Sequence, residues 1–431
     1  MVEALDYNKR YSLSQLGNSV GTLVTQFGME DIDSRGKIPF TSPRLNYETY
    51  GGISVGSIVQ FVGRESSGKT TTALDLVKNA QAIFEKEYEE EVSKYEALVF
   101  GKNPKKEDKE KYEELLNCGK RKVAYFNFEN TMDKMWALRL GVDISKDAIY
   151  YATSTEKTTA EEALDTVVAV AQTGQVGMIV VDSIISLISE QLLNESVGKA
   201  KVGGIAQTVA KWIRKMVPIC HDRGITMVVI NQVIANIKNP YADFEIPCGQ
   251  ALRHHSDVIL VFKKDEFIND IGESLGKNAE TPSGNITKVY VQKSKTFKPD
   301  RRVGFYSISY DYGVDLVLDV FDLAIEFKAI EKSGGWYSLL DPKAKKPFIG
   351  EDGKPLKFQG KANVIEYLRT YPSVADIYVN YVNELIEQSA QLVKVRETED
   401  GILIRNADEE PVEEPTEKPK EETVKTRGKK K

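Results

Sequence analysis

The chain has 431 residues, of which 41% are hydrophobic and 28% are charged, and its formal net charge is −6. This length and composition exclude a disordered or fibrous chain and are typical of a globular protein with two or three domains. No apolar run is long enough to span a membrane, the first residues are not expected to form a signal peptide, and the three cysteines lack metal-ligand spacing. We therefore expect a cytoplasmic protein that contacts no membrane. The negative net charge means that any nucleic-acid binding must come from local basic segments.

The N-terminal region contains one predicted helix. Apolar residues in the stretch 12–27 recur at helical spacing, and Gly28 ends the pattern. Residues 29–57 are rich in turn-forming residues and lead into the first strand of a core domain.

That strand introduces a phosphate-binding loop. The apolar run that starts at Ile58 predicts a buried strand, residues 63–70 match the P-loop pattern G-x-x-x-x-G-K-[ST], and an amphipathic helix follows. In such a loop, backbone N–H groups surround phosphates and the helix N-terminus adds a favourable dipole. Lys69 can reach the β- and γ-phosphates, and the Thr70 hydroxyl can ligate Mg²⁺. The expected nucleotide-binding residues are Gly63, Arg64, Glu65, Ser66, Ser67, Gly68, Lys69, Thr70 and Thr71.

The segment after the P-loop helix has a different character. Residues 85–122 are dense in Glu and Lys, with a turn-forming stretch around Gly101 and Pro104. This composition predicts two charged helices joined by a turn, a solvated hairpin inserted at the surface.

Three further apolar runs predict core strands that deliver polar residues at their ends. They are Val123–Phe128, followed by Glu129; Met178–Asp182; and Thr226–Asn231, followed by Gln232. Predicted helices at 159–172 and 205–221 alternate with them, which favours an α/β fold with a mainly parallel central sheet flanked by helices. Because parallel strands bind ligands at their carboxyl ends, these polar residues and the P-loop should lie close together.

The residue types at that edge are those of a nucleoside triphosphatase. Asp182 ends an apolar strand as a Walker B residue does, and it can orient Mg²⁺ and its waters. Glu129 can orient and polarise the attacking water, and Gln232 can sense the γ-phosphate. Each residue alone could simply cap a strand end, but together they predict hydrolysis of a nucleoside triphosphate.

Two long loops follow the last two strands, at about 194–204 and 233–249, and loops of this length are usually functional or disordered. Beyond them the sequence predicts a strand at 258–262 and a turn-rich excursion at 263–284. A strand pair at 288–292 and 305–310 should follow, with basic residues in the connection.

The last part of the chain reads as a small domain and a tail. Helical stretches at 316–330, 361–369 and 373–389 predict a small separate α/β domain over 314–398. Residues 399–431 are acidic and then basic, which is typical of a disordered tail.

Taken in chain order, these motifs resemble the RecA recombinase family in its bacterial and phage branches, from about Gln26 to about residue 395. The motifs that carry the resemblance are Gly63–Thr70, Phe128–Asp133, Leu140–Asp143, Val180–Ser183, Ile230–Gln232, Gln292–Lys295, Gly335–Tyr337 and Gln359–Asn363. No single motif beyond the P-loop is decisive, but the ordered set is highly specific.

The resemblance implies an ATP-dependent DNA recombinase with a RecA-like P-loop ATPase core at 46–313 and with ATP and Mg²⁺ as cofactors. Such proteins polymerise on single-stranded DNA as a helical filament and exchange it with a homologous duplex in recombination and repair. Residues 1–45 would then be an N-terminal polymerisation helix and strand that dock on the adjacent subunit. Single-strand-binding and mediator proteins would be possible partners.

The same resemblance implies roles for individual residues. ATP would lie between subunits, so that Lys293 and Lys295 would reach the neighbour's γ-phosphate and join Lys69, Glu129 and Gln232 in catalysis. The adenine would be contacted by Asp133, Trp136 and Tyr310. DNA would be bound by Lys199, Lys201 and Lys238 in the two loops and by Arg214 in the helix after the first loop. Phosphate contacts of this kind ignore base identity, which suits loading on any sequence.

The sequence departs from the bacterial pattern around the second loop. Ile234 and Asn236 replace basic residues, the motif that closes the loop begins with Cys248, and His254 replaces an aromatic residue. The insert at 85–122 has no counterpart in the typical bacterial protein. Such divergence on an intact ATPase framework suggests a phage or otherwise divergent recombinase.

Two other functions stay open at this point. A ring-forming relative on the same core, such as a replicative helicase or a branch-migration motor, would lack the Lys293 and Lys295 pair, the Gly-Gly-Trp-Tyr domain and the docking segment. A DNA-coating protein that binds ATP without turning it over is disfavoured by the presence of Lys69, Glu129 and Gln232.

Overall fold

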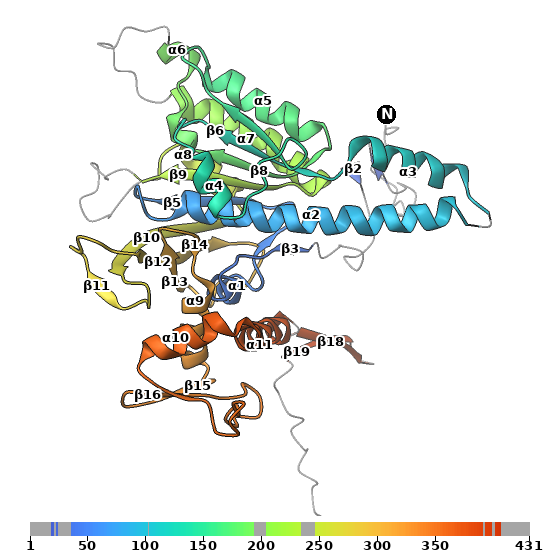
Figure 1. Ribbon diagram of the computed structural model, residues 1–431. Helices are drawn as coiled ribbons and strands as arrows, with labels where there is room; N and C mark the ends of the chain where they lie inside the picture. The colour runs from blue at the N-terminus through green and yellow to red at the C-terminus, as the bar shows by residue number, and fades with distance from the viewer. Residues whose placement is uncertain are drawn as a thin grey trace, which may run out of the picture.

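The computed structural model describes residues 19–20, 23–24, 36–101, 103–193, 204–233, 246–390, 393–398 and 401–406. A large central sheet carries helices on both faces, and a smaller C-terminal unit lies below it in Figure 1. The strand order is β14-β13-β12-β10-β5-β9-β8-β6-β7, with the short β11 paired to β10. The six strands from β10 to β7 in this order are mutually parallel. The predicted α/β class with a mainly parallel central sheet flanked by helices is therefore confirmed.

The parallel strands form one continuous part of the sheet. They are β5 (Ile58–Gly63), β6 (Lys122–Asn127), β7 (Ile149–Thr153), β8 (Val176–Asp182), β9 (Thr226–Gln232) and β10 (Val258–Ile268). The antiparallel extension consists of β11 (Ser274–Gly276), β12 (Gly284–Ser294), β13 (Val303–Ser309) and β14 (Gly313–Val314). β10 joins the two parts, because it is parallel to β5 on one side and antiparallel to β12 on the other.

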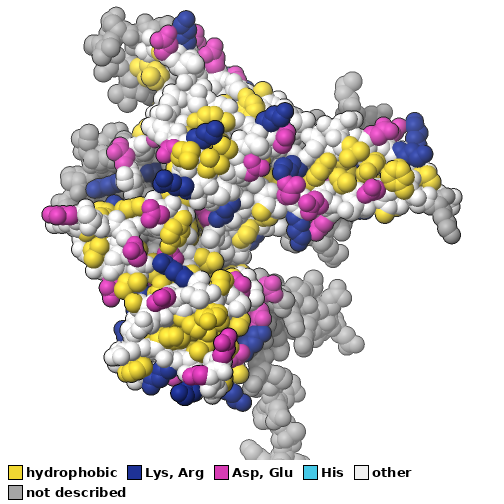
Figure 2. Space-filling model, viewed as in Figure 1, with side chains coloured by type: hydrophobic (Ala, Val, Ile, Leu, Met, Phe, Trp, Pro, Cys, Tyr) yellow, Lys and Arg dark blue, Asp and Glu magenta, His cyan; other side chains and the backbone are white. Residues whose placement is uncertain are grey.

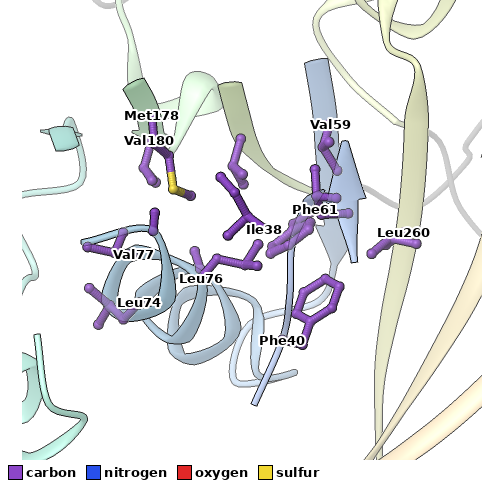
Figure 3. Packing of buried hydrophobic residues seen from close by; sticks show 14 of the residues in the cluster. Ile38, Phe40, Val59, Phe61, Leu74, Leu76, Val77, Met178, Val180 and Leu260 are labelled. Carbon is purple, nitrogen blue, oxygen red and sulfur yellow. The ribbon is translucent and has the colours of Figure 1, made fainter. Parts of the chain in front are cut away.

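Helices cover both faces of the parallel part, which explains why its strands are nearly continuous apolar runs. Successive side chains of a strand point to opposite faces. Phe61 of β5 packs with α2 (Lys69–Val99) in one core cluster, which Figure 3 shows from close by. Ile58 of the same strand packs with α5 (Ala160–Gln172) and α7 (Gly204–Arg223) in the other.

The P-loop helix is much longer than its contact with the sheet. α2 has 31 residues, about 46 Å at a rise of 1.5 Å per residue, and its buried residues end at Phe84. Beyond that point it pairs with α3 (Lys106–Cys118), which has no buried residue, and the two form a projecting arm (Figure 1). The charged hairpin expected at 85–122 is thus the outer half of the P-loop helix plus one further helix. Figure 2 shows hydrophobic and charged side chains interspersed along this arm.

The turn-rich excursion expected at 263–284 is wrong in extent. β10 continues to Ile268 and pairs there with the first residues of β12, so the turn region shrinks to 269–283. An ion pair between Lys288 and Asp265, with 2.8 Å between Nζ and Oδ2, joins the two strands across the extension. The second half of β10 contains charged residues, so it lacks the apolar pattern that predicts a strand. These residues stabilise the strand through cross-strand pairs rather than through burial.

The C-terminal unit is built around a hydrophobic cluster that also includes Ile268 of β10. Its elements are α9 (Leu316–Glu326), β15 (Ile330–Ser333), β16 (Trp336–Leu339), β17 (Lys357–Gln359), α10 (Lys361–Thr370) and α11 (Pro372–Ala390). Phe321 and Leu368 pack with Leu339 of its three-stranded sheet. No helix in the described ranges is both long and apolar enough to cross a membrane.

The expectation of a disordered tail from residue 399 is wrong for its first strand. β18 (Val393–Thr398) and β19 (Gly401–Asn406) form an antiparallel hairpin. The β-branched and apolar run at 402–404 favours a strand, a preference that the acidic composition of the tail as a whole obscured. Residues 407–431 lie outside the described residues.

The helix expected over 12–27 is wrong where the structure describes this stretch. β1 (Ser19–Val20) and β2 (Leu23–Val24) pair with each other in antiparallel fashion, and valine favours extended backbone. The rest of residues 1–35 lies outside the described ranges. After it come β3 (Lys37–Ile38), α1 (Pro43–Glu48) and β4 (Ile53–Ser54).

α1 packs against β13 and α9 and carries buried charged groups. The Ser42 hydroxyl caps the helix and also donates to the buried carboxylate of Asp319. Burial raises the pKa of Glu48 to about 7, although the charges of Arg44 and Arg301 act in the opposite direction.

Glu48→Gln is expected to change how stability depends on pH. The pKa of this carboxyl rises from 4.5 to about 7 on folding, so folding favours the protonated form. The wild type should therefore lose stability as the pH rises from about 4.5 to about 7, whereas the neutral glutamine avoids this loss. Urea denaturation should show equal stability near pH 4.5 and an advantage of about 1–3 kcal/mol for the variant near pH 8. Glu113→Gln on the exposed face of α3 is the control, and a pH-independent difference would contradict the argument.

Candidate nucleotide site

Four strand ends meet at one edge of the parallel sheet, which we call the carboxyl edge. β5 leads into the P-loop, β6 is followed closely by Glu129, β8 ends at Asp182 and β9 ends at Gln232. The order β5-β9-β8-β6 makes these strands consecutive neighbours. The structure therefore brings together the four features that the sequence placed at strand ends.

The P-loop backbone depends on two glycines. Gly68, the N-cap of α2, has a φ of +94°, and a Cβ there would lie 2.7 Å from Ile308 Cδ1. A Cβ at Gly63 would lie 2.5 Å from the carbonyl oxygen of Phe262. Only glycine fits both positions, and the bare backbone leaves the first N–H groups of α2 uncovered by side chains.

Lys69 lies folded into this loop. Its Nζ donates hydrogen bonds to the carbonyl oxygens of Gly63 (3.0 Å) and Arg64 (2.7 Å). Burial lowers the pKa of Lys69, and the carboxylates of Asp182 and Glu129 act in the opposite direction. A buried cation thus faces two carboxylates at the carboxyl edge.

Asp182 connects the P-loop helix to the sheet. Its Oδ2 accepts from the Thr70 hydroxyl at 3.0 Å and from the Tyr125 hydroxyl at 2.7 Å. Burial raises the pKa of Asp182, and these hydrogen bonds and Lys69 oppose the rise. A hydroxyl and a carboxylate held side by side are oxygen ligands of the kind that Mg²⁺ prefers.

Glu129 is held by two donors from neighbouring strand ends. Its Oε1 accepts from the Ser183 hydroxyl and, at 2.9 Å, from Gln232 Nε2. Asn231, beside Gln232, donates from Nδ2 to the carbonyl oxygen of Pro247 at 3.1 Å. The carboxylate therefore has a fixed orientation, and both hydrogen bonds end on the same oxygen.

Sequence reasoning missed two of these contributors. Tyr125 was not singled out, and the contact of Ser183 with Glu129 was not expected. Strand alternation puts Tyr125 on the face of the sheet that packs with α2, where Thr70 also lies, so this signal could have found it. No such pattern predicts the contact of Ser183 with Glu129, because the sequence does not show which residues of neighbouring strands lie side by side.

One buried hydroxyl in the P-loop supports a phosphate ligand. Ser67 Oγ is buried and has no hydrogen-bond partner among the described residues. Buried polar atoms without a partner are rare in native proteins. A phosphate oxygen accepting from Ser67 would satisfy it, so the loop fits the triphosphate predicted from its sequence.

The three residues expected at the adenine belong to two parts of the chain, residues 133–136 and residue 310. Asp133 is the N-cap of α4 (Lys134–Arg139), where its Oδ1 accepts from the Met135 N–H at 2.8 Å. Trp136 is half-buried and packs against the core cluster of α2. Tyr310 is exposed, with its ring centroid 5.9 Å from Lys264 Nζ. Gly313, which follows it closely, lies against Leu140, the C-cap of α4.

Lys293 and Lys295 lie at the opposite edge of the sheet from the P-loop. β10 runs parallel to β5 with Phe262 beside Gly63, and the end of the antiparallel β12 lies beside the start of β10. The four steps from Val258, which lies opposite Ser294 between the two lysines, to Phe262 span about 13 Å at about 3.3 Å per step. The structure thus does not bring these lysines to the P-loop of their own chain.

Of the four residues expected to bind DNA, Lys199, Lys201 and Lys238 lie outside the described residues. Arg214 is exposed on α7. An open groove of about 1030 Å³ adjoins the P-loop, and its lining includes four basic residues. They are Arg64, Lys263, Lys264 and Arg302.

Comparison with known proteins finds similarity to RecA, and the family match covers β6 to β14 but not the P-loop. The RecA N-terminal domain family matches residues 115–315, from within α3 to the start of the C-terminal unit. A protein RecA from Ruminococcus albus is 27% identical over 344 residues, which cover 80% of this chain and 70% of the relative. A protein RecA from Heliobacterium modesticaldum is 27% identical over 326 residues, which cover 75% of this chain and 76% of the relative.

Proposed function

The chain belongs to the RecA family, and we propose that it is an ATP-dependent DNA recombinase that forms helical filaments on single-stranded DNA and pairs it with a homologous duplex. One observation carries the proposal. The carboxyl edge holds the P-loop, Asp182, Glu129 and Gln232, whereas the lysine pair lies at the opposite edge. Two half-sites on opposite edges suit an enzyme whose active site is completed by a neighbouring subunit.

The residues of the carboxyl edge fit ATP as substrate and Mg²⁺ as cofactor. Lys69, Ser67 and the backbone N–H groups at the start of α2 would hold the phosphates. Thr70 and Asp182 would hold the metal ion, directly or through its waters. When bound, Mg²⁺ would supply positive charge that neutralises the β- and γ-phosphate oxygens.

Glu129 is the residue we propose to orient the attacking water. Ser183 and Gln232 both donate to its Oε1, which leaves Oε2 to accept a proton from that water. Because Gln232 bonds to Glu129 and ends the strand before the second loop, it links the orientation of the carboxylate to that loop.

DNA binding is proposed on the loops and on basic surfaces near the nucleotide. Lys199, Lys201 and Lys238 belong to the proposed loop contacts, and Arg214 is exposed on the helix after the first loop. The basic groove beside the P-loop is a second surface that suits a phosphate backbone. Single-strand-binding and mediator proteins are proposed partners in loading.

The test combines ATP hydrolysis with electron microscopy. We expect single-stranded DNA to stimulate hydrolysis strongly, and ATP with single-stranded DNA to give long helical filaments. Discrete rings alone would favour a ring-forming helicase or motor. Binding of DNA in the presence of ATP, with no turnover, would favour a DNA-coating protein.

A further inference from the structure

One short helix connects the two half-sites within each subunit. α8 (Gly249–His255) lies in the chain between β9, which ends at the carboxyl edge, and β10, which begins at the opposite edge. Asn231 holds the carbonyl of Pro247 just before α8 begins, next to the Glu129–Gln232 contact. α8 therefore starts beside the nucleotide residues and ends at the edge where the lysine pair lies.

Lys293 is bound to the end of this helix. Its Nζ donates to the carbonyl oxygens of Arg253 at 2.8 Å and His254 at 2.9 Å. The last carbonyls of a helix have no partner within the helix and carry its negative end, so an ammonium group there is held by hydrogen bonds and by charge. A β-bulge at Gln292, opposite the step from Ile259 to Leu260, directly precedes the lysine. Bulges of this kind re-aim the side chains next to them.

Lys295 is bound to a carboxylate that follows α8. Its Nζ lies 3.2 Å from Asp257 Oδ1, and its backbone N–H donates to the Asp257 carbonyl at 2.8 Å. The other carboxylate oxygen of Asp257 accepts from the N–H of Ile58, the first residue of the P-loop strand, at 2.9 Å. Asp257 thus fixes the lysine to the rigid sheet rather than to a loop.

We propose that Asp257 is a positioning residue, which holds Lys295 directly and, together with the end of α8, sets the lysine pair for hydrolysis in the neighbouring subunit. This inference rests on the proposed function. An ammonium group has three N–H donors. Among the described residues, the ammonium group of Lys293 donates two hydrogen bonds and that of Lys295 donates one. Each ammonium group can therefore keep these hydrogen bonds while it donates to a phosphate.

The electrostatics of the pair agree with this role. Burial and the neighbouring charge of Lys295 lower the pKa of Lys293, and Asp257 acts in the opposite direction. Two like charges this close repel each other, and the carboxylate offsets the repulsion and keeps both groups in a fixed arrangement. Donors that are positioned before the reaction stabilise developing charge more than mobile ones do.

Asp257→Asn tests the proposal in the full-length protein. Asparagine keeps one oxygen for the Ile58 N–H and removes the charge that faces Lys295. We expect about a tenfold loss of kcat in DNA-stimulated ATP hydrolysis, with little change in KM for ATP, because the nucleotide-binding half-site is untouched. Asp257→Glu, which keeps the charge, should lose less. Asp265→Asn removes a carboxylate of β10 that pairs with Lys288 of β12, and it should behave as the wild type.

Mixed assemblies separate positioning from a structural defect at the start of β5. Asp257→Asn subunits have an intact P-loop, so mixing them with Lys69→Ala subunits, whose lysine pair is intact, should restore activity at shared sites. A structural defect in β5 would instead damage the variant's own P-loop. Three outcomes would overturn the inference. Hydrolysis could recover only when Asp257→Asn subunits are mixed with Lys295→Ala subunits, it could recover with neither partner, or Asp257→Asn alone could be fully active.

A further mixture distinguishes a failure of the role of Asp257 from a failure of the proposed function. Lys295→Ala and Lys69→Ala subunits have defects on opposite edges and should complement each other whether or not Asp257 matters. If that pair fails to recover, or the wild type shows no DNA-stimulated hydrolysis, the shared site itself is wrong. If that pair recovers and Asp257→Asn does not, only the role of Asp257 is wrong.

Discussion

Alanine at Lys293 or Lys295 is expected to lower DNA-stimulated ATP hydrolysis by about 10³-fold, while ATP binding by the free subunit stays close to wild type. Cations that reach a transferred phosphoryl group from another subunit have effects of at least this size. The subunit's own P-loop is about 13 Å away along the strands, so its binding half-site does not depend on the lysines. Steady-state hydrolysis with single-stranded DNA and binding of a labelled ATP analogue measure the two effects separately.

Lys298→Ala is a matched control for this experiment. Lys298 lies with Lys295 in the connection between β12 and β13, and its exposed side chain pairs with Asp300 at 3.1 Å. Its removal should leave hydrolysis within about twofold of wild type, because exposed ion pairs contribute little. A comparable loss for Lys298→Ala, or weaker ATP binding by the free Lys295→Ala subunit, would contradict a specific role for the lysine pair.

Glu129→Gln is expected to reduce kcat by about 10²- to 10³-fold and to leave the binding of ATP and DNA intact. Glutamine keeps an oxygen that can accept from Ser183 and Gln232, so the local geometry should persist. It cannot accept a proton as a carboxylate does. Single-turnover hydrolysis in the presence of DNA measures the loss, and Glu156→Gln, at an exposed position after β7, serves as the control.

Equal turnover in the Glu129 variant and the wild type would remove Glu129 from the mechanism. A loss of ATP binding in the variant would point instead to a structural role, in which Glu129 ties the ends of β6, β8 and β9 together.

The parallel core could be predicted from the sequence because a strand that is buried on both faces is a continuous run of apolar residues. Val176–Asp182 and Thr226–Gln232 are such runs, and each delivers its polar residues at a predictable edge. The extension of β10 could not be predicted in the same way. Its charged residues owe their strand conformation to β12, a partner that is distant in sequence.

Among the helices, too, some could be predicted from the sequence and others could not. α5 has apolar residues at helical spacing and a capping box formed by Thr159 and Glu162, so both its type and its start are local properties. The seven residues of α8 are too few for a periodic pattern, and only Leu252 among them is buried. The helix lies in the connection that returns the chain from β9 to β10, which a sequence reading alone does not reveal.

The candidate site was predictable residue by residue, but its connections were not. Lys69, Asp182, Glu129 and Gln232 each follow from a motif or a strand end. Their partners depend on which strands are neighbours, so Tyr125 appears in the site only once β6 lies beside β8. The location of Lys293 and Lys295 likewise depends on the antiparallel direction of β12.

The separation of the two half-sites on opposite edges determines how many complete sites an assembly of subunits contains. If the neighbouring subunit completes each site, as proposed, an open chain of subunits contains one complete site fewer than it has subunits, because one terminal P-loop would face no lysine pair. A single subunit then has none, and the turnover per subunit rises with the length of the assembly toward a plateau. A closed ring has as many complete sites as subunits. Its turnover per subunit would not depend on length, so the activity of size-fractionated assemblies reports whether the polymer is open or closed.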